Sequence, residues 1–233
     1  ERIAERIDAN LLNISMEDLA MLNRKLFNDK ITNLQNKTTG TLIIKEYPTA
    51  SAHTGHIRTL VNELALKRTF KPDIIFVDYI NICASARFKP GSNVNSYTYV
   101  KAIAEEMRGL AVELDLPIVT ATQTTRTGFV STDIGLEDTS ESFGLPATAD
   151  FMFALISSEE LERAGQMLVK QLKNRYNDPT LNRKFIIGVD RARMKLFDIE
   201  QQAQNLIQPE EEKYVEHNSK DKETEEKYKD FNF

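Results

Sequence analysis

KPDIIFVD, residues 71–78, is the stretch of sequence that decides the fold class of this chain. Pro72 interrupts any preceding helix, and four consecutive apolar residues then lead to Asp78. A short, uninterrupted apolar run is typical of a strand that is buried on both faces of a parallel sheet. Asp78 would stand at the carboxyl end of this strand, which is the edge where open α/β sheets bind their ligands.

Two amphipathic segments flank this strand and predict helices. Before it, four apolar residues follow helical spacing on one face: Ile57, Leu60, Val61 and Leu64. After it, residues 97–115 carry a longer apolar face, and residues 117–123, PIVTATQ, predict the next strand. This repeated alternation of strand and helix indicates an α/β domain with a parallel sheet.

The remaining strands lie outside this alternation. Residues 41–47, TLIIKEY, form a short β-rich run that Pro48 closes. Residues 150–156, DFMFALI, predict another strand, and Ser157 or Ser158 then caps a short helix. Two or three further strands follow in the sequences QMLVKQLK (166–173), KFIIGVD (184–190) and MKLFDIE (194–200). Because no helix separates these last strands, we expect the mostly parallel sheet to end in an antiparallel extension.

The composition is that of a soluble globular protein. Of the 233 residues, 41% are apolar and 28% are charged, which excludes a wholly disordered chain and a membrane-embedded one. No apolar run approaches the roughly 20 residues that cross a bilayer, and the first ten residues do not resemble a signal peptide. The single cysteine, Cys83, and the three scattered histidines exclude a disulfide framework and a structural zinc cluster. We therefore expect a cytoplasmic protein with no membrane partner.

Charge is unevenly divided along the chain. The net charge is −5, and residues 209–233 hold nine acids and five lysines, so the rest of the chain carries only −1. A nearly neutral body excludes a protein that coats nucleic acid over its whole surface, but it allows basic side chains focused on one channel. We therefore divide the chain into a domain, residues 1–207, and a charged tail, residues 208–233.

The tail is too poor in apolar residues to build a core, and we expect it to be disordered. Its end carries three aromatic residues, Tyr228, Phe231 and Phe233. Two interpretations stay equally open, an inert solubilising tail and a short docking peptide for a partner protein.

Polar side chains end two successive strands of the predicted parallel sheet. Asp78 could hold a hydrated Mg²⁺ ion beside nucleotide phosphates, although a strand-ending acid often only caps a turn. Gln123 ends the next strand, where its amide could donate to a γ-phosphate oxygen, orient the attacking water, or cap its own loop. Because the ends of parallel strands meet at one edge, the two residues together favour a nucleotide site more than either does alone.

Two cations, Lys173 and Arg175, lie two residues apart in the predicted strand VKQLKNR (169–175) and so project from one face. They could reach the phosphates of a nucleotide bound to a neighbouring subunit, because a planar guanidinium spreads its charge over several phosphate oxygens. The alternative is a solvated strand edge that charge protects from further pairing.

Four stretches together carry a resemblance to a known family. They are IIFVDYINIC (74–83), NSYTYVKAIAEEMRGLAVELDLPIVTATQ (95–123), SESFGLPATADFMFALI (140–156) and VKQLKNRYNDP (169–179). These stretches resemble the RecA-like P-loop NTPase core, or motor domain, of hexameric replicative DNA helicases. The resemblance is to the DnaB-like family, most of all to its T4-type bacteriophage members, and it covers nearly all of residues 1–207.

The resemblance implies an ATP hydrolase that uses ATP and Mg²⁺ to translocate on single-stranded DNA as a homo-hexameric ring and to unwind duplex DNA at the replication fork. It implies that Asp78 is the Walker B acid, which holds Mg²⁺ through water, and that Gln123 is the γ-phosphate sensor. Arg175 would be the arginine finger donated to the adjacent subunit's ATP, with Lys173 as its companion cation. The implied partners are primase, a helicase loader and a single-strand-binding protein, in the host cytoplasm.

The resemblance also implies a DNA-gripping loop at residues 138–144, DTSESFG. Family members often carry an arginine near Ser140, and in its absence the residues left to contact DNA are Ser140, Glu141, Ser142, Phe143 and Gly144. Three other cations could supply positive charge to the channel instead: Arg87, Lys89 and Arg126. For any one of these three, an ordinary solvated loop cation is the preferred interpretation.

One family motif is missing, because no GxxxxGK[ST] loop occurs in the sequence. In the family this phosphate-binding loop precedes the segment that residues 1–10 match, so we expect the C-terminal part of a longer helicase, truncated within its motor domain. Such a fragment should not hydrolyse ATP and should be poorly stable alone, because the missing strand is central to the sheet. The alternative is a non-catalytic RecA-like scaffold or regulator of the replication machinery.

Overall fold

The computed structural model of this chain describes residues 2–88, 93–124, 134–136, 144–178, 181 and 183–199. The predicted tail, residues 208–233, lies outside the described residues, and both interpretations of its aromatic end stay predictions. Among the helices of the described part, none combines the length and the apolar character needed to cross a bilayer.

Helices and strands both contribute to the described structure. The helices are α1 (Arg2–Leu12), α2 (Met16–Met21), α3 (Arg24–Lys37), α4 (Thr54–Arg68), α5 (Ser96–Leu114), α7 (Gly144–Thr148) and α8 (Glu159–Arg163), with a short 3-10 helix, η1 (Ile80–Ile82). The strands are β1 (Ile75–Val77), β2 (Ile118–Thr120), β3 (Phe151–Ile156), β4 (Gln166–Asn174), β5 (Lys184–Asp190) and β6 (Lys195–Asp198). The two helices predicted beside β1 are confirmed as α4 and α5. Ser158 is the residue that caps α8, since its Oγ accepts a hydrogen bond from the Leu161 amide at 3.3 Å.

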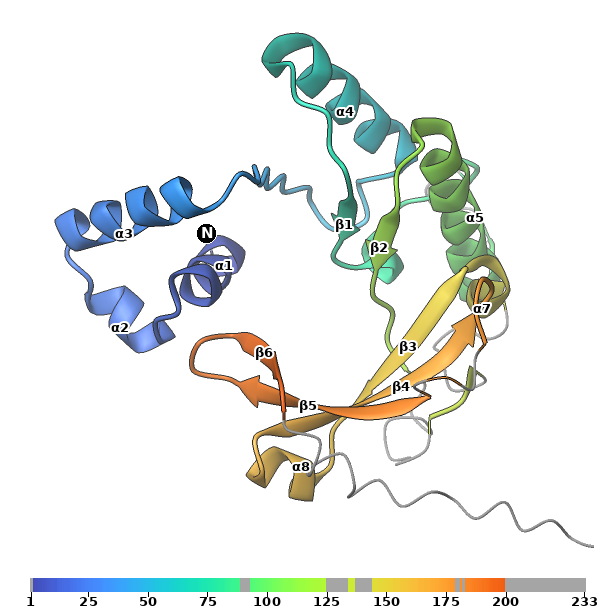
Figure 1. Cartoon of the computed structure of the whole chain (residues 1–233). Coiled ribbons are helices and arrows are strands. Elements are labelled where there is room, and N and C mark those ends of the chain that lie inside the picture. Colours follow the sequence, from blue (N-terminus) through green and yellow to red (C-terminus); the bar gives the residue numbers. More distant parts are fainter. Residues whose placement is uncertain are drawn as a thin grey trace, which may run out of the picture.

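The described strands form two sheets (Figure 1). β1 and β2 pair in parallel with Val77 opposite Thr120, whereas β3, β4, β5 and β6 pair antiparallel in that order. The predicted α/β class and the antiparallel extension are therefore confirmed. The expected continuity is not observed, because within the described residues the parallel pair is not hydrogen-bonded to the antiparallel sheet.

Two expectations about strands are wrong. β1 is not buried on both faces: Val77 packs against the core, but Phe76 on the opposite face is 69% exposed. Residues 41–47 form neither helix nor strand, and Leu42 and Ile44 are both more than half exposed. A β-rich segment becomes a strand only where a neighbour accepts and donates its backbone hydrogen bonds, and none of the described strands pairs with residues 41–47.

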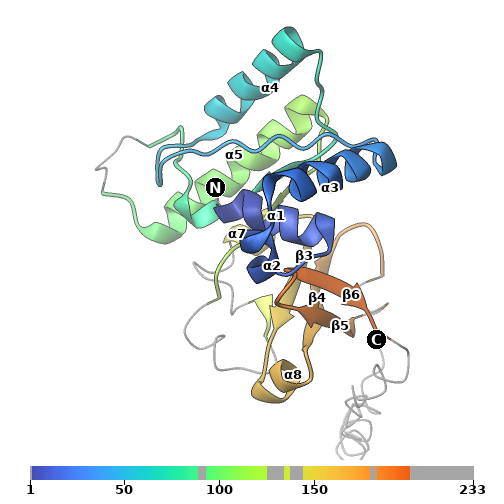
Figure 2. The ribbon, with the colours of Figure 1, turned by 90° about the vertical axis from the view of Figure 1, so that its left-hand side faces the viewer.

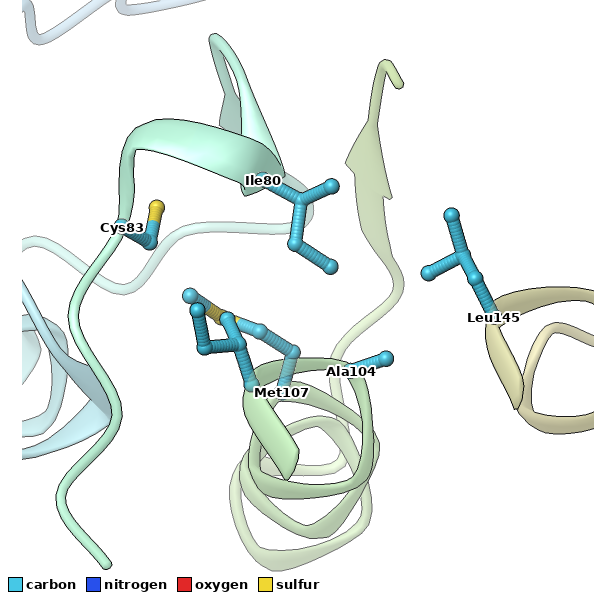
Figure 3. Close-up of a cluster of buried hydrophobic side chains, with 6 residues drawn as sticks. Ile80, Cys83, Ala104, Met107 and Leu145 are labelled. Carbon is cyan, nitrogen blue, oxygen red and sulfur yellow. The ribbon is translucent and has the colours of Figure 1, made fainter. Parts of the chain in front are cut away.

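The larger of two buried hydrophobic clusters in the described residues lies where η1, α5 and α7 meet, and it is called the core below (Figure 3). Ile80 of η1, Ile103 and Met107 of α5, and Leu145 of α7 are buried together. α5 contributes several residues to this core because its apolar residues recur at helical spacing. The start of the helix is capped, since Asn95 Oδ1 accepts a hydrogen bond from the Thr98 amide at 2.7 Å. The core thus fixes the carboxyl end of β1 against α5 and α7.

We expect Ile103→Ala to lower the free energy of unfolding by about 2–5 kcal/mol, because Ile103 is completely buried and its truncation leaves a cavity. The matched control is Val112→Ala on the same helix, since Val112 is 75% exposed and should change the free energy by less than about 0.5 kcal/mol. Urea unfolding of the complete protein measures both effects. Equal shifts for the two variants would show that this cluster does not stabilise the domain.

α1 and the start of α2 contact the turn at the tip of the antiparallel sheet (Figure 2), and α3 packs against α1. Asn10 Nδ2 donates a hydrogen bond to the Met194 carbonyl oxygen at 2.6 Å, and the Met16 amide donates to the Ala192 oxygen at 2.9 Å. Both acceptors lie in the turn between β5 and β6. The side chain of Ser15 caps α2, so the sequence carried a signal for this helix that the motif analysis passed over.

Candidate functional site

Asp78 and Gln123 lie at the carboxyl ends of two adjacent parallel strands. Asp78 directly follows β1, and Gln123 follows β2 by three residues; both side chains are exposed. Gln123 Nε2 donates a hydrogen bond to Tyr79 Oη at 3.2 Å, which ties the end of β2 to the residue next to Asp78. The structure therefore brings these two predicted residues to one edge of the parallel pair.

Two hydroxyl groups strengthen the link between these strand ends. Thr122 Oγ1 donates to Asn81 Oδ1 at 2.9 Å, and Thr120 Oγ1 donates to the Val77 carbonyl oxygen at 2.8 Å. Both bonds join residues more than 40 positions apart in the sequence. Sequence analysis missed Tyr79, Asn81 and Thr122, because their contribution depends on contacts across the strands; the one available signal was their closeness to Asp78 and Gln123.

The residue types at this edge suit a hydrated Mg²⁺ ion beside a phosphate. Mg²⁺ is bound through one or two carboxylates together with water and substrate phosphates rather than by a dedicated protein cage. An exposed Asp78 carboxylate fits this mode. Within the described part of the chain, no group of three or more acidic, histidine or cysteine residues is arranged to hold a metal ion by itself.

Lys173 and Arg175 meet at the carboxyl end of α7. Lys173 Nζ donates hydrogen bonds to the carbonyl oxygens of Pro146 at 2.6 Å and Ala147 at 3.3 Å. Arg175 Nη2 donates to the same Ala147 oxygen at 2.6 Å. The two cations therefore lie on one side of the chain, and they hold the end of β4 against α7.

Asp150 lies between two guanidinium groups. Arg108 Nη1 donates to Asp150 Oδ1 at 2.6 Å and to the Thr148 carbonyl oxygen at 2.7 Å, and Arg175 Nη1 reaches the same Oδ1 at 3.2 Å. Partial burial alone would raise the pKa of the Asp150 carboxyl, but the hydrogen bond and charge of Arg108, aided by Arg175, hold that pKa below its ordinary value. Sequence analysis missed Asp150 and Arg108, which are 42 residues apart.

The cations outnumber the carboxylates in this cluster. Arg108, Lys173 and Arg175 surround Asp150, and partial burial together with the charge of Arg175 lowers the pKa of the Lys173 ammonium. Three cations beside one carboxylate leave repulsion between positive charges in this cluster. An anion bound here would relieve that repulsion, which is the electrostatic property expected of a phosphate-binding surface.

The two groups of predicted residues are not joined. Within the described residues, no hydrogen bond or ion pair links Asp78 or Gln123 to Lys173 or Arg175. A single chain thus offers an acid with an amide at one place and a pair of cations at another.

The predicted DNA-contacting residues fall into three groups. Arg87 is half exposed and forms ion pairs with Glu105 and Glu106 of α5, so acids of the same chain offset its charge. Gly144 is buried at the start of α7, where a Cβ atom would lie 3.0 Å from the Lys101 side chain, so close packing explains a glycine there. The others lie outside the described residues: Lys89, Arg126, Ser140, Glu141, Ser142 and Phe143.

Known proteins are similar to this chain in sequence and in structure. Residues 1–227 match the family model of the DnaB-like helicase C terminal domain. The DnaB-like replicative helicase of Enterobacteria phage T4 is 47% identical over 204 residues, which are 86% of this chain and 43% of that protein. The chain therefore spans less than half the length of this curated relative.

Solved structures show the same fold at low sequence identity. A DnaB-like replicative helicase, solved in a study of its interactions with primase, matches with a TM-score of 0.66 and 16% identity over 84% of this chain and 47% of that one. The ATPase domain of G40P matches with a TM-score of 0.67 and 16% identity over 84% of this chain and 69% of that one. The resemblance drawn from the sequence motifs is confirmed, and the chain belongs to the DnaB-like helicase C-terminal domain family.

Proposed function

We propose that this chain is the part of an ATP-driven replicative DNA helicase that carries the Mg²⁺-binding acid, the phosphate sensor and the arginine finger. One observation carries the proposal. A chain that matches a helicase family over residues 1–227 also presents an exposed acid and an exposed amide at adjacent ends of two parallel strands. This edge is where α/β proteins bind nucleotides.

The active site is completed between subunits. Asp78 of one subunit would hold a hydrated Mg²⁺ ion, and Gln123 of the same subunit would contact the γ-phosphate. Bound Mg²⁺ would supply charge neutralisation to the phosphate oxygens. Arg175 and Lys173 of the neighbouring subunit add positive charge to the same phosphate. Within the described residues no hydrogen bond or ion pair joins the two pairs, and the second pair lies in a cluster of three cations and one carboxylate; both observations support a shared site.

The complete protein translocates on single-stranded DNA as a homo-hexameric ring, and residues 138–144 line its channel. ATP hydrolysis at each interface moves one subunit relative to the next, and the DNA-contacting loops move with it. A structural relative was solved in a study of its interactions with primase, which supports primase as a partner. A helicase loader and a single-strand-binding protein follow from the family resemblance, as does action in the host cytoplasm.

A strand-separation assay tests this function against the non-catalytic scaffold. We expect the complete protein to separate a labelled forked DNA duplex in the presence of ATP and Mg²⁺. It should not do so with a non-hydrolysable ATP analogue or after chelation of Mg²⁺. A folded, oligomeric protein that binds DNA but neither hydrolyses ATP nor separates strands would favour the scaffold. The match to helicases and to an ATPase domain favours the enzyme.

A further inference from the structure

The Arg175 side chain is held in place by its own subunit. Its Nη1 atom donates to Asp150 Oδ1 at 3.2 Å, its Nη2 atom donates to the Ala147 carbonyl oxygen at 2.6 Å, and its backbone amide donates to the Asp150 carbonyl oxygen at 3.0 Å. Two contacts at different nitrogens fix the plane of a guanidinium, which still has further N–H donors available for a phosphate.

We propose that Asp150 is a positioning residue for Arg175, and that Arg108 fixes Asp150 in turn. This inference rests on the proposed function, because it assumes that Arg175 acts on a nucleotide. Asp150 does not need to touch that nucleotide. It sets the direction in which the Arg175 guanidinium points out of its subunit.

Arg108 connects this arrangement to the core. Arg108 lies on α5 beside the buried Met107, and its Nη1 atom bridges Asp150 Oδ1 and the Thr148 carbonyl oxygen at the end of α7. α7 is itself anchored, since Leu145 belongs to the core that contains Met107 (Figure 3). The path from the core to Arg175 therefore runs through α5, Arg108 and Asp150.

The ion pair contributes much less to stability than to position. The side chains of Asp150, Arg108 and Arg175 are each 35–40% exposed, and pairs exposed to this extent typically stabilise a fold by at most about 1 kcal/mol. By contrast, a displacement of a catalytic group by about 1 Å can cost roughly 100-fold in rate. A large loss of turnover with little loss of stability is thus the signature of a positioning role.

The test uses ATP hydrolysis by the complete protein assembled on single-stranded DNA. We expect Asp150→Ala to lower kcat by about 10- to 100-fold, with KM for ATP and the unfolding midpoint nearly unchanged. Asp150→Asn keeps the side-chain shape and removes only its charge, so it tests the same point if the alanine variant folds poorly. Glu113→Ala is the matched control, because Glu113 pairs with Arg58 through two 2.6 Å bonds away from Arg175, and kcat should not change.

A double-variant cycle separates positioning from a general defect. If Asp150 acts through Arg175, Asp150→Ala should cause no further loss of kcat in a protein that already carries Arg175→Ala. Subunits with Asp150→Ala, mixed with Asp78→Asn subunits that keep an intact Arg175, should regain activity at the interfaces they share.

Three results would overturn the inference in distinguishable ways. If Asp150→Ala has the wild-type kcat and Arg175→Ala is inactive, Asp150 has no positioning role, but the proposed role of Arg175 is unaffected. Multiplicative losses in the double variant would show that Asp150 acts independently of Arg175. Full activity in Arg175→Ala would exclude Arg175 as the arginine finger, and the positioning role of Asp150 would be excluded with it.

Discussion

We expect Arg175→Ala to abolish DNA-stimulated ATP hydrolysis by the complete protein while leaving nucleotide binding largely intact. The expected loss in kcat is about 10³- to 10⁵-fold, because an arginine finger stabilises the charge that develops on the transferring phosphoryl group. Binding survives because Asp78 and Gln123 belong to the other side of the interface. Steady-state ATPase assays with a fluorescent-nucleotide binding assay measure the two quantities separately.

The control for this variant is Arg163→Ala. Arg163 lies on α8, is largely exposed and, among the described residues, pairs with Glu159 one turn earlier, so its loss should leave kcat unchanged. A second test mixes subunits that carry Arg175→Ala with subunits that carry Asp78→Asn. Arg175→Ala and Asp78→Asn subunits should each be inactive alone, but a mixed ring of the proposed kind would contain interfaces with one intact Asp78 and one intact Arg175. Activity should therefore return in mixtures, and mixtures that stay inactive at every ratio would exclude an Arg175 that works between subunits.

Asp78→Asn is expected to have the second largest effect. An amide cannot supply the negative charge that holds a hydrated Mg²⁺ ion, and loss of that interaction costs several kcal/mol of transition-state stabilisation. This corresponds to a decrease of about 10²- to 10³-fold in kcat. The Mg²⁺ concentration needed for half-maximal activity should also rise. ATPase rates measured over a series of Mg²⁺ concentrations report both changes.

Asp73→Asn is the matched control for this substitution. Asp73 is an exposed acid just before β1, at the opposite end of the strand from Asp78. Asp73→Asn therefore removes the same charge from the amino end of the strand, where no nucleotide is proposed to bind. Its kcat and its Mg²⁺ dependence should match those of the wild type. If the two variants behave alike, the carboxyl edge of the parallel pair is not where Mg²⁺ acts.

Helices with a long apolar face were predictable from sequence, because their periodicity reflects burial along their whole length. α5 is the best example, since its predicted apolar face supplies half of the buried residues in the core cluster around Ile80. Residues 41–47 show the opposite case: their β propensity was evident, but pairing depends on a neighbouring strand, which local sequence does not specify. The exposure of Phe76 was missed for the same reason, because burial depends on what covers each face.

The candidate site divides along similar lines. Asp78 and Gln123 were predictable because a strand end and a residue type together indicate a chemistry, and the structure places both at one edge. Asp150 and Arg108 were not, because neither forms a motif and their pairing exists only after α5, α7 and β4 have packed together. The sequence thus indicated which side chains could take part in the reaction, whereas the folded structure shows which other side chains hold them in position.

The most direct test of the shared site is a structure of the complete ring with single-stranded DNA and an ATP analogue. The decisive measurement is the distance from the Arg175 guanidinium to the nearest γ-phosphate. We predict a hydrogen-bond distance, roughly 3 Å, to a nucleotide whose other contacts are Asp78 and Gln123 of the adjacent subunit. An Arg175 that lies far from every nucleotide, or that contacts only the nucleotide of its own subunit, would contradict the account.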